Sequence, residues 1–304
     1  MQIYLPIAEM SVDVFLLLAL GGGVGVLSGL FGVGGGFLLT PLLLFIGVPA
    51  AVAVASQANQ VVAASVSGAL AQWRRNAVDP KLAWVMIGGG LVGAWIGVLL
   101  FNALKDAGQI DIAIALSYVL LLGVVGGLML FESLRSWLFP RRRTRTSQAR
   151  RHSPLLAALP LKLRFRKSRL YLSAIAPAFI GMIVGALAAL LGIGGGFLLV
   201  PAMIYLLGVP TAVSIGSSLF QVACVSAVVA FLHAVETQSV DVVLAAILLI
   251  GSTLGAQVGA RLAGKMRGEQ LRALLAIVIL AVATQLAIDL ATPPIDPFDF
   301  VAAE

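Results

Sequence analysis

The twelve residues at positions 30–41, LFGVGGGFLLTP, recur at positions 190–201 as LLGIGGGFLLVP, with nine of the twelve positions identical. The matches continue in the same order along the chain, since the Gly-Val-Pro at 47–49 recurs at 208–210. Chance similarity between apolar segments does not preserve glycines and prolines in this way. The sequence therefore predicts an internal duplication.

This duplication divides the chain into an N-terminal half at 1–131, a connecting segment at 132–170 and a C-terminal half at 171–304. Within the two halves, the matching regions span about 11–131 and 172–290. Each half contains five hydrophobic segments in the same order. We expect each half to form one structural repeat.

The composition places these segments in a membrane. The chain is 60% hydrophobic and 11% charged, with a mean hydropathy of +1.06, whereas a soluble domain is about 45–50% apolar and about 25% charged. The second segment of each half, at 36–46 and 196–207, is too short for a membrane-spanning helix of about 20 residues. The sequence predicts an all-α polytopic membrane protein in which these two segments are half-helices, tilted helices or parts of re-entrant hairpins.

Basic residues predict the orientation of the two halves. Residues 132–170 carry twelve of the twenty Lys and Arg residues and only one acidic residue, Glu132, so their net charge is +11 and that of the remaining chain is −4. The loops at 73–81 and 261–272 are also basic, but the equivalent loop of the opposite half is not basic in either case. Basic loops face the cytoplasm, so both termini are expected on the periplasmic side of a bacterial inner membrane and the repeats are inverted. The basic segment is then a topological signal that meets anionic lipid head groups, and not a nucleic-acid-binding arm.

The glycine clusters predict breaks near the pseudo-twofold axis that relates the halves. Glycine disfavours helix, and non-helical backbone within a membrane lies inside the protein or beside a wet cavity. A helix that begins after such a break presents free N–H groups and a partial positive charge. The sequence therefore predicts that an anion binds at the glycine clusters 32–36 and 192–196, which include Gly34, Gly35, Gly36, Gly194, Gly195 and Gly196. The alternative is that these glycines only permit close helix packing.

Polar side chains on the third segment of each half are the second predicted component of the site. Ser56 and Gln60 are four residues apart and share a helix face, and Ser217 and Gln221 repeat this pair. Gln57 has no counterpart of the same type. We therefore expect the recurring pairs to contact the anion, the alternative being hydrogen bonds between helices.

Few residues are suited to catalysis or metal binding. The chain has one cysteine and two histidines, and no charged residue lies near the middle of a hydrophobic segment. We expect neither an enzyme nor a metal or other cofactor. An uncharged site suits a small oxyanion better than a cation or a proton relay.

The duplicated G-x-G-G-G-F-L-L-x-P motif, with the Gly-Val-Pro that follows it, resembles the TauE/SafE family of sulfite and organosulfonate exporters. The resemblance covers nearly the whole chain apart from the basic segment and the tails. It implies a secondary transporter, with export of a small sulfur-containing anion by alternating access. The alternatives are an uptake permease for a similar anion, and a membrane scaffold or regulator that acts through the basic segment.

Overall fold

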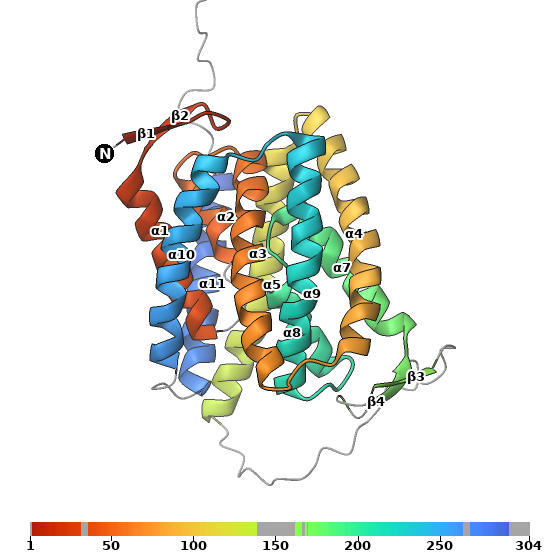
Figure 1. Ribbon diagram of the computed structural model, residues 1–304. Coiled ribbons are helices and arrows are strands. Elements are labelled where there is room, and N and C mark those ends of the chain that lie inside the picture. The colour runs from red at the N-terminus through yellow and green to blue at the C-terminus, as the bar shows by residue number, and fades with distance from the viewer. Residues whose placement is uncertain are drawn as a thin grey trace, which may run out of the picture.

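The computed structural model describes residues 2–31, 36–138, 162–165, 168, 170–263 and 268–291. Two features predicted from the sequence fall outside these residues: Gly34 and Gly35 of the first glycine break, and most of the basic connecting segment. The described residues form a helical bundle with a two-stranded hairpin at each end (Figure 1).

The first half consists of an antiparallel hairpin followed by five helices: β1 (Gln2–Leu5), β2 (Met10–Asp13), α1 (Val14–Phe31), α2 (Gly36–Phe45), α3 (Ala50–Arg74), α4 (Pro80–Asp106) and α5 (Ile110–Leu138). The second half repeats this order and adds a π-helical turn: β3 (Lys162–Phe165), β4 (Leu170–Ser173), α7 (Ile175–Leu191), α8 (Gly196–Tyr205), α9 (Thr211–Leu232), η1 (His233–Thr237), α10 (Val242–Ala263) and α11 (Gly268–Ala291). The second hairpin lies partly within residues 132–170, which the sequence predicts to be the connecting segment. The structural repeat therefore begins at the hairpin, about ten residues before the first apolar segment.

The repeated Gly-Val-Pro motif forms the turn between the second and third helices of each half. Gly47 and Gly208 adopt left-handed conformations with φ of +90° and +69°, which residues with a Cβ atom rarely adopt. The valine after each glycine is buried and donates its N–H to a carbonyl of the preceding helix. The proline then directly precedes the next helix. The motif is thus a helix-ending turn that has the same structure in both halves.

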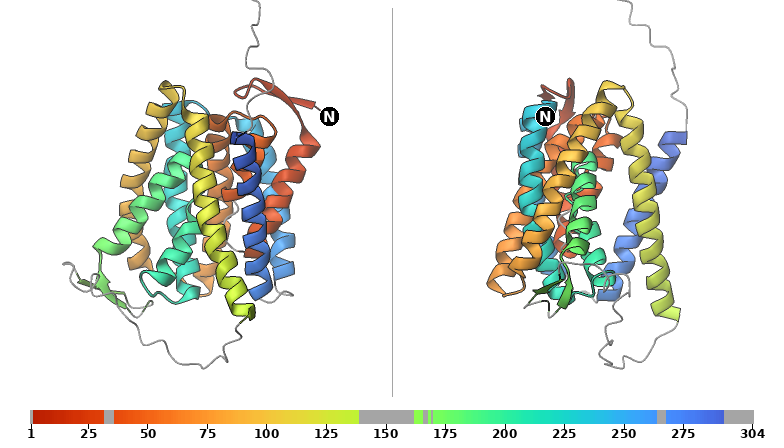
Figure 2. Two further views of the ribbon diagram at one scale, coloured as in Figure 1. Left: turned by 180° about the vertical axis from the view of Figure 1, so that it is seen from behind. Right: turned by 90° about the vertical axis from the view of Figure 1, so that its right-hand side faces the viewer.

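The contacts between helices, together with the positions of the two hairpins (Figure 1), show that the two halves are related by inversion. The main pairs are α1 with α10, α4 with α7, α3 with α9 and α5 with α11, and Figure 2 shows the last pair from two further sides. When each helix is replaced by its equivalent in the other half, the α1–α10 pair becomes the α7–α4 pair, and the α3–α9 and α5–α11 pairs stay the same. A pseudo-twofold axis produces this pattern. β1–β2 and β3–β4 lie at opposite ends of the bundle, and α11 ends at the β1–β2 end (Figure 1).

The short helices do not cross the bundle. α2 and α8 have ten residues each, about 15 Å of helix and half of a hydrocarbon core about 30 Å thick. α2 lies toward the β1–β2 end, where α1 begins, and α8 lies toward the β3–β4 end, where α7 begins (Figure 1). Each therefore returns the chain to the end it came from, which makes α1–α2 and α7–α8 re-entrant pairs.

Within the described residues, five helices are long and apolar enough to span a membrane: Pro80–Asp106, Ile110–Phe131, Ala212–Thr237, Val242–Gly259 and Leu274–Ala291. α3 is 25 residues long and runs the full height of the bundle (Figure 1), but it carries a cluster of polar side chains. Large apolar side chains such as Trp95 and Leu120 are exposed on the outside of the bundle, as in a protein surrounded by lipid. The chain is a polytopic all-α membrane protein.

Candidate functional site

The second glycine break is a tight reversal between α7 and α8, buried in the bundle. Gly192, Gly194 and Gly195 have φ of +69°, +72° and +76°, so three of four consecutive residues require the left-handed region. A Cβ atom at Gly194 would lie 2.2 Å from Val61 Cγ1, and one at Gly195 would lie 2.4 Å from Val184 Cγ1. Both the conformation and the close packing therefore require glycine here.

The half-helices α2 and α8 meet at their N-terminal ends. Phe37 and Phe197, the second residues of these helices, stack with ring centroids 4.5 Å apart and an interplanar angle of 11°. Since the two phenylalanines occupy equivalent positions of the repeat, their contact lies on the pseudo-twofold axis. Two helix N-termini, each with a partial positive charge, are thus close together inside the bundle.

Gln57 links the two breaks. Its Nε2 donates to the carbonyl oxygen of Gly192 at 2.7 Å and also to that of Gly36, and its Oε1 accepts a bond of 2.6 Å from the Thr40 hydroxyl. All of these groups are buried. Gln57 therefore holds the end of α7 beside the start of α2.

Gln57 and Thr40 were not assigned to the site from the sequence, although a signal was present. Both are positions at which the halves differ, since Val200 replaces Thr40 and Ser218 replaces Gln57 in the second half. Two polar residues that occur together in only one repeat indicate a contact made on one side of the axis. The repeat pattern of the sequence instead predicts the recurring serine–glutamine pairs as the anion contacts.

Replacing Gln57 with leucine is expected to lower the free energy of unfolding by about 2–4 kcal/mol, because it leaves buried polar groups unpaired at roughly 1–3 kcal/mol each. Transport should fall with it, since the two breaks lose their link. Thermal unfolding in detergent measures the stability change. Asn59→Leu, at a half-buried position of the same helix, is the matched control and should change stability little. Equal unfolding temperatures for the two variants would contradict the role of Gln57.

Ser56 and Ser217 make equivalent contacts near opposite ends of the bundle. The Ser56 hydroxyl oxygen accepts a bond of 2.8 Å from the Asp241 N–H, and that of Ser217 accepts one of 2.9 Å from the Asp79 N–H. These hydroxyls hold the loops that precede α10 and α4. Neither bonds to a glycine of the described break.

The two aspartates in turn hold the β-hairpins. The Asp241 carboxylate accepts a bond of 3.1 Å from the Ile7 N–H in the turn of β1–β2. The Asp79 carboxylate accepts bonds of 2.9 and 2.8 Å from the N–H and hydroxyl of Ser168, in the turn of β3–β4. Among the described residues these are the only buried carboxylates. Each serine–aspartate pair thus joins the central helices to the hairpin at one end.

Gln60 and Gln221 differ from Gln57 because their amide oxygens have no hydrogen-bond partner. Each side chain is 1% exposed, and neither Oε1 atom has a hydrogen-bond partner. The same is true of the hydroxyl oxygens of Ser65 and Ser226, which are also equivalent positions of the repeat. Unpaired buried polar groups are uncommon in native proteins and call for an explanation, such as an absent ligand or water.

The predicted site residues therefore fall into three groups. The first group lies where the half-helices meet and consists of Gly36, Gly194, Gly195 and Gly196. The second group is Ser56 and Ser217, which form the serine–aspartate contacts Ser56–Asp241 and Ser217–Asp79, called here the end contacts. The third group is Gln60 and Gln221, which lie beside the centre of the bundle. Val61, which follows Gln60, lies against Gly36 and Gly194, and Gln221 Nε2 lies against Gly90 of α4. The described residues include no group of three His, Cys, Asp or Glu that could hold a metal ion.

Inverted repeats that contain half-length helices broken near the middle of the bundle are typical of secondary membrane transporters. The chain belongs to the sulfite exporter TauE/SafE family, whose family model matches residues 17–286. It is 31% identical over 249 residues to the "Probable membrane transporter protein YjnA" of Bacillus subtilis, covering 81% of this chain and 87% of the relative.

Two further relatives come from Xylella fastidiosa and are both called "Probable membrane transporter protein". The protein of strain 9a5c is 34% identical over 210 residues, and that of strain Temecula1 is 34% identical over 213 residues. Each alignment covers 66% of this chain and 67% of the relative. No solved structure matches the chain.

Proposed function

We propose that this transporter exports a small sulfur-containing oxyanion, sulfite or an organosulfonate, across the bacterial inner membrane by alternating access. The observation that carries the proposal is the equivalent pair Gln60 and Gln221, each buried with an unpaired amide oxygen beside the axis. An amide can exchange the positions of its oxygen and its NH₂ group by turning about its last bond, because the two ends have nearly the same shape. It can therefore donate hydrogen bonds to an anion without placing a charge in the membrane.

The surroundings of the site support an anion over a cation. The N-termini of α2 and α8 meet at Phe37 and Phe197, and helix N-termini favour negative charge. Oδ2 of the buried Asp79 and both carboxylate oxygens of the buried Asp241 accept hydrogen bonds from N–H and O–H groups near the ends of the bundle. The two buried carboxylates therefore lie near the ends of the bundle and not at its centre.

The end contacts suggest how access could alternate. Ser56–Asp241 connects α3 to the β1–β2 end, and Ser217–Asp79 connects α9 to the β3–β4 end. Both contacts are formed together in this structure, which corresponds to a state closed at both ends. Breaking one pair while the other holds would open the site to one side of the membrane.

Charge supports the proposed orientation and direction. The β3–β4 end, where α5 ends and β3 begins (Figure 1), carries the exposed cations Arg74, Arg75, Lys81 and Arg261. The positive-inside rule makes this end cytoplasmic and both termini periplasmic. An inside-negative potential of about 100 mV then favours the exit of a monovalent anion by roughly 2.3 kcal/mol, so export needs no coupling ion.

Replacing Gln60 and Gln221 together with leucine separates a binding role from a structural one. Removing an unpaired buried amide should leave the unfolding temperature unchanged or raise it, since such a group costs about 1–3 kcal/mol. Export should nevertheless fall ten-fold or more. The assay is efflux of sulfite or methanesulfonate from proteoliposomes under an inside-negative potential, with the exposed Gln257→Leu on α10 as control.

Two outcomes would overturn the proposal. One is the absence of saturable flux of sulfite, sulfate or any sulfonate through the unmodified protein. The other is unchanged export by the double variant. A double variant that fails to fold would instead mean that the two amides are structural, and would contradict the assignment of these residues.

A further inference from the structure

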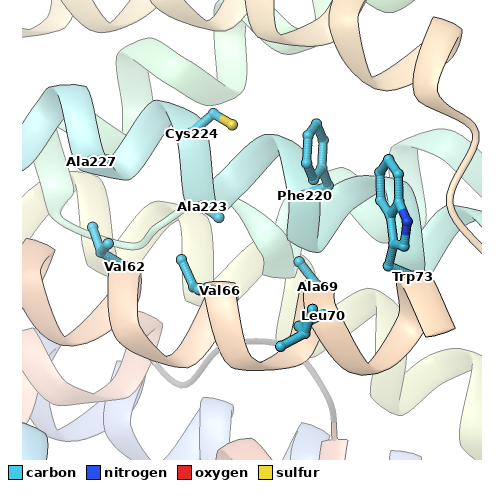
Figure 3. Close-up of a pocket in the computed structure, with 9 residues that line it drawn as sticks. All are labelled: Val62, Val66, Ala69, Leu70, Trp73, Phe220, Ala223, Cys224 and Ala227. Atoms are coloured by element: carbon cyan, nitrogen blue, oxygen red, sulfur yellow. The ribbon is translucent and has the colours of Figure 1, made fainter.

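An apolar groove runs along the outside of the bundle between α3 and α9, outside the site described above. Its volume is about 520 Å³, and its lining is almost entirely apolar: Val62, Val66, Ala69, Leu70, Trp73, Phe220, Ala223, Cys224 and Ala227. Figure 3 shows the two helices as its walls, with Trp73 and Phe220 close together at one end. Val66 and Leu70 are each more than half exposed. This volume lies within the roughly 300–1,000 Å³ of typical ligand pockets.

The groove covers half the thickness of a membrane. From Val62 to Trp73, α3 advances eleven residues, which is about 16 Å and close to half of a hydrocarbon core about 30 Å thick. α3 ends at Arg74, so the groove reaches from the middle of the bundle to its β3–β4 end (Figure 1). A tail of one lipid in a single leaflet has a matching position and length.

The two ends of the groove differ in aromatic content and charge. At the β3–β4 end, Phe220 contacts both Trp73 and Trp84, with ring centroids 5.5 and 6.2 Å apart, and tryptophan is enriched at membrane interfaces. Arg74 and Arg75 follow Trp73 directly, and both are exposed. Beyond the other end of the groove, the exposed residues include Phe231 of α9 and the acidic Glu236 of η1, and the exposed Lys105 donates a hydrogen bond to the Thr237 carbonyl oxygen beside them, so this end has no excess of positive charge. The basic end of the groove thus lies at the level where a lipid head group would be.

We propose that the α3–α9 groove binds one anionic phospholipid, with a tail along Val66 and Ala223 and the head group at Arg74 and Arg75. Juxtamembrane basic residues attract anionic lipids by roughly a factor of five each in affinity. The apolar walls supply the contact with the tail, and the arginines supply the preference for head-group charge. The residues of this site lie outside the basic segment at 132–170 in the sequence, and the proposal does not depend on which anion is transported.

The test is native mass spectrometry of the full chain in detergent, with added dioleoyl phosphatidylglycerol or dioleoyl phosphatidylcholine. The unmodified protein should retain one phosphatidylglycerol in preference to phosphatidylcholine. R74Q/R75Q should weaken phosphatidylglycerol binding more than ten-fold with little change for phosphatidylcholine. Val66→Trp, which fills the groove, should remove retention of both lipids. Arg261→Gln is the matched control, because it removes an exposed arginine from the same end of the bundle, on α10.

Three results would overturn the proposal. Equal retention of the two lipids by the unmodified protein would exclude a site for head-group charge. An equal loss in R261Q would show that the preference is a general effect of surface charge. Unchanged lipid retention in Val66→Trp, together with a change in oligomeric state, would assign the groove to contact with a second copy of the chain.

Discussion

Gly194→Ala is expected to lower the free energy of unfolding by about 2–5 kcal/mol and to abolish transport. The backbone at this residue has φ of +72°, a conformation that costs a residue with a Cβ atom about 1–2 kcal/mol. The new Cβ atom would also lie 2.2 Å from Val61 Cγ1, and such overpacking costs roughly 1–3 kcal/mol more. The change would displace α3 from the place where the half-helices meet. Thermal unfolding in detergent and anion flux from proteoliposomes are the measurements.

Gly208→Ala is the matched control for backbone strain. Gly208 has φ of +69°, but a Cβ atom there would have no neighbour within 4 Å, so only the conformational cost of about 1–2 kcal/mol applies. The excess loss in Gly194→Ala should shrink when Val61 is replaced with alanine in the same chain, because that change removes the clashing methyl groups. Equal losses in the two single variants, or no recovery in the double variant, would contradict the close contact between the break and α3.

Gly93→Ala is expected to cost about 3 kcal/mol or more by separating α4 from α7. A Cβ atom at Gly93 would lie 1.9 Å from the carbonyl oxygen of Met182. A backbone atom cannot move aside as a flexible side chain can, so the helices themselves must separate, and overpacking of this kind reaches the upper end of its usual range. The effect should be seen as a large fall in unfolding temperature and poor recovery of folded protein.

Gly88→Ala lies on the same helix and should have the opposite effect. A Cβ atom at Gly88 would have nothing within 4 Å, so alanine should raise helix stability by up to about 1 kcal/mol. Gly255→Ala in α10 provides an independent repeat of the Gly93 test, since its Cβ atom would lie 2.0 Å from the Gly22 carbonyl oxygen. Similar stabilities of Gly93→Ala and Gly88→Ala would mean that α4 and α7 are not packed backbone to backbone.

The two repeats and their inversion could be predicted from the sequence because the repeated motifs and the loop charges are each visible within a short stretch of residues. The paired glycine motifs at 30–41 and 190–201 predicted equivalent breaks, and the short segments after them predicted half-length helices; α8 follows the described break, and α2 matches it in length. The opposite charge of equivalent loops predicted inversion, which the equivalent hairpins β1–β2 and β3–β4 confirm because they lie at opposite ends of the bundle (Figure 1). These features can be predicted from the sequence because each depends only on the types of residue in a short stretch of the chain.

The roles of the individual site residues could not be predicted from the sequence. Ser56 and Gln60 share a helix face in the sequence, yet the structure places the Ser56 hydroxyl at Asp241, 185 residues away in the sequence, and leaves the Gln60 oxygen without a partner. Gln57, between them, bonds to Gly192, 135 residues away. No local pattern distinguishes these three roles, because each depends on which distant helix faces that side of α3.

The sequence by itself determined the membrane setting, the two repeats and their opposite orientation, because composition, repetition and loop charge are properties of the chain alone. Tertiary structure decided which helices pair across the axis, which polar groups hold the breaks and the hairpins, and which remain unpaired. The physical reason is that a helix face is apolar whether it contacts lipid or another helix. In a soluble protein, the hydrophobic pattern shows which face of a helix packs against other helices. In a membrane protein it does not, so it cannot specify which helices are neighbours. Close contacts such as Gly93 with Met182 and the bonds of Gln57 supply that information only once the chain is folded.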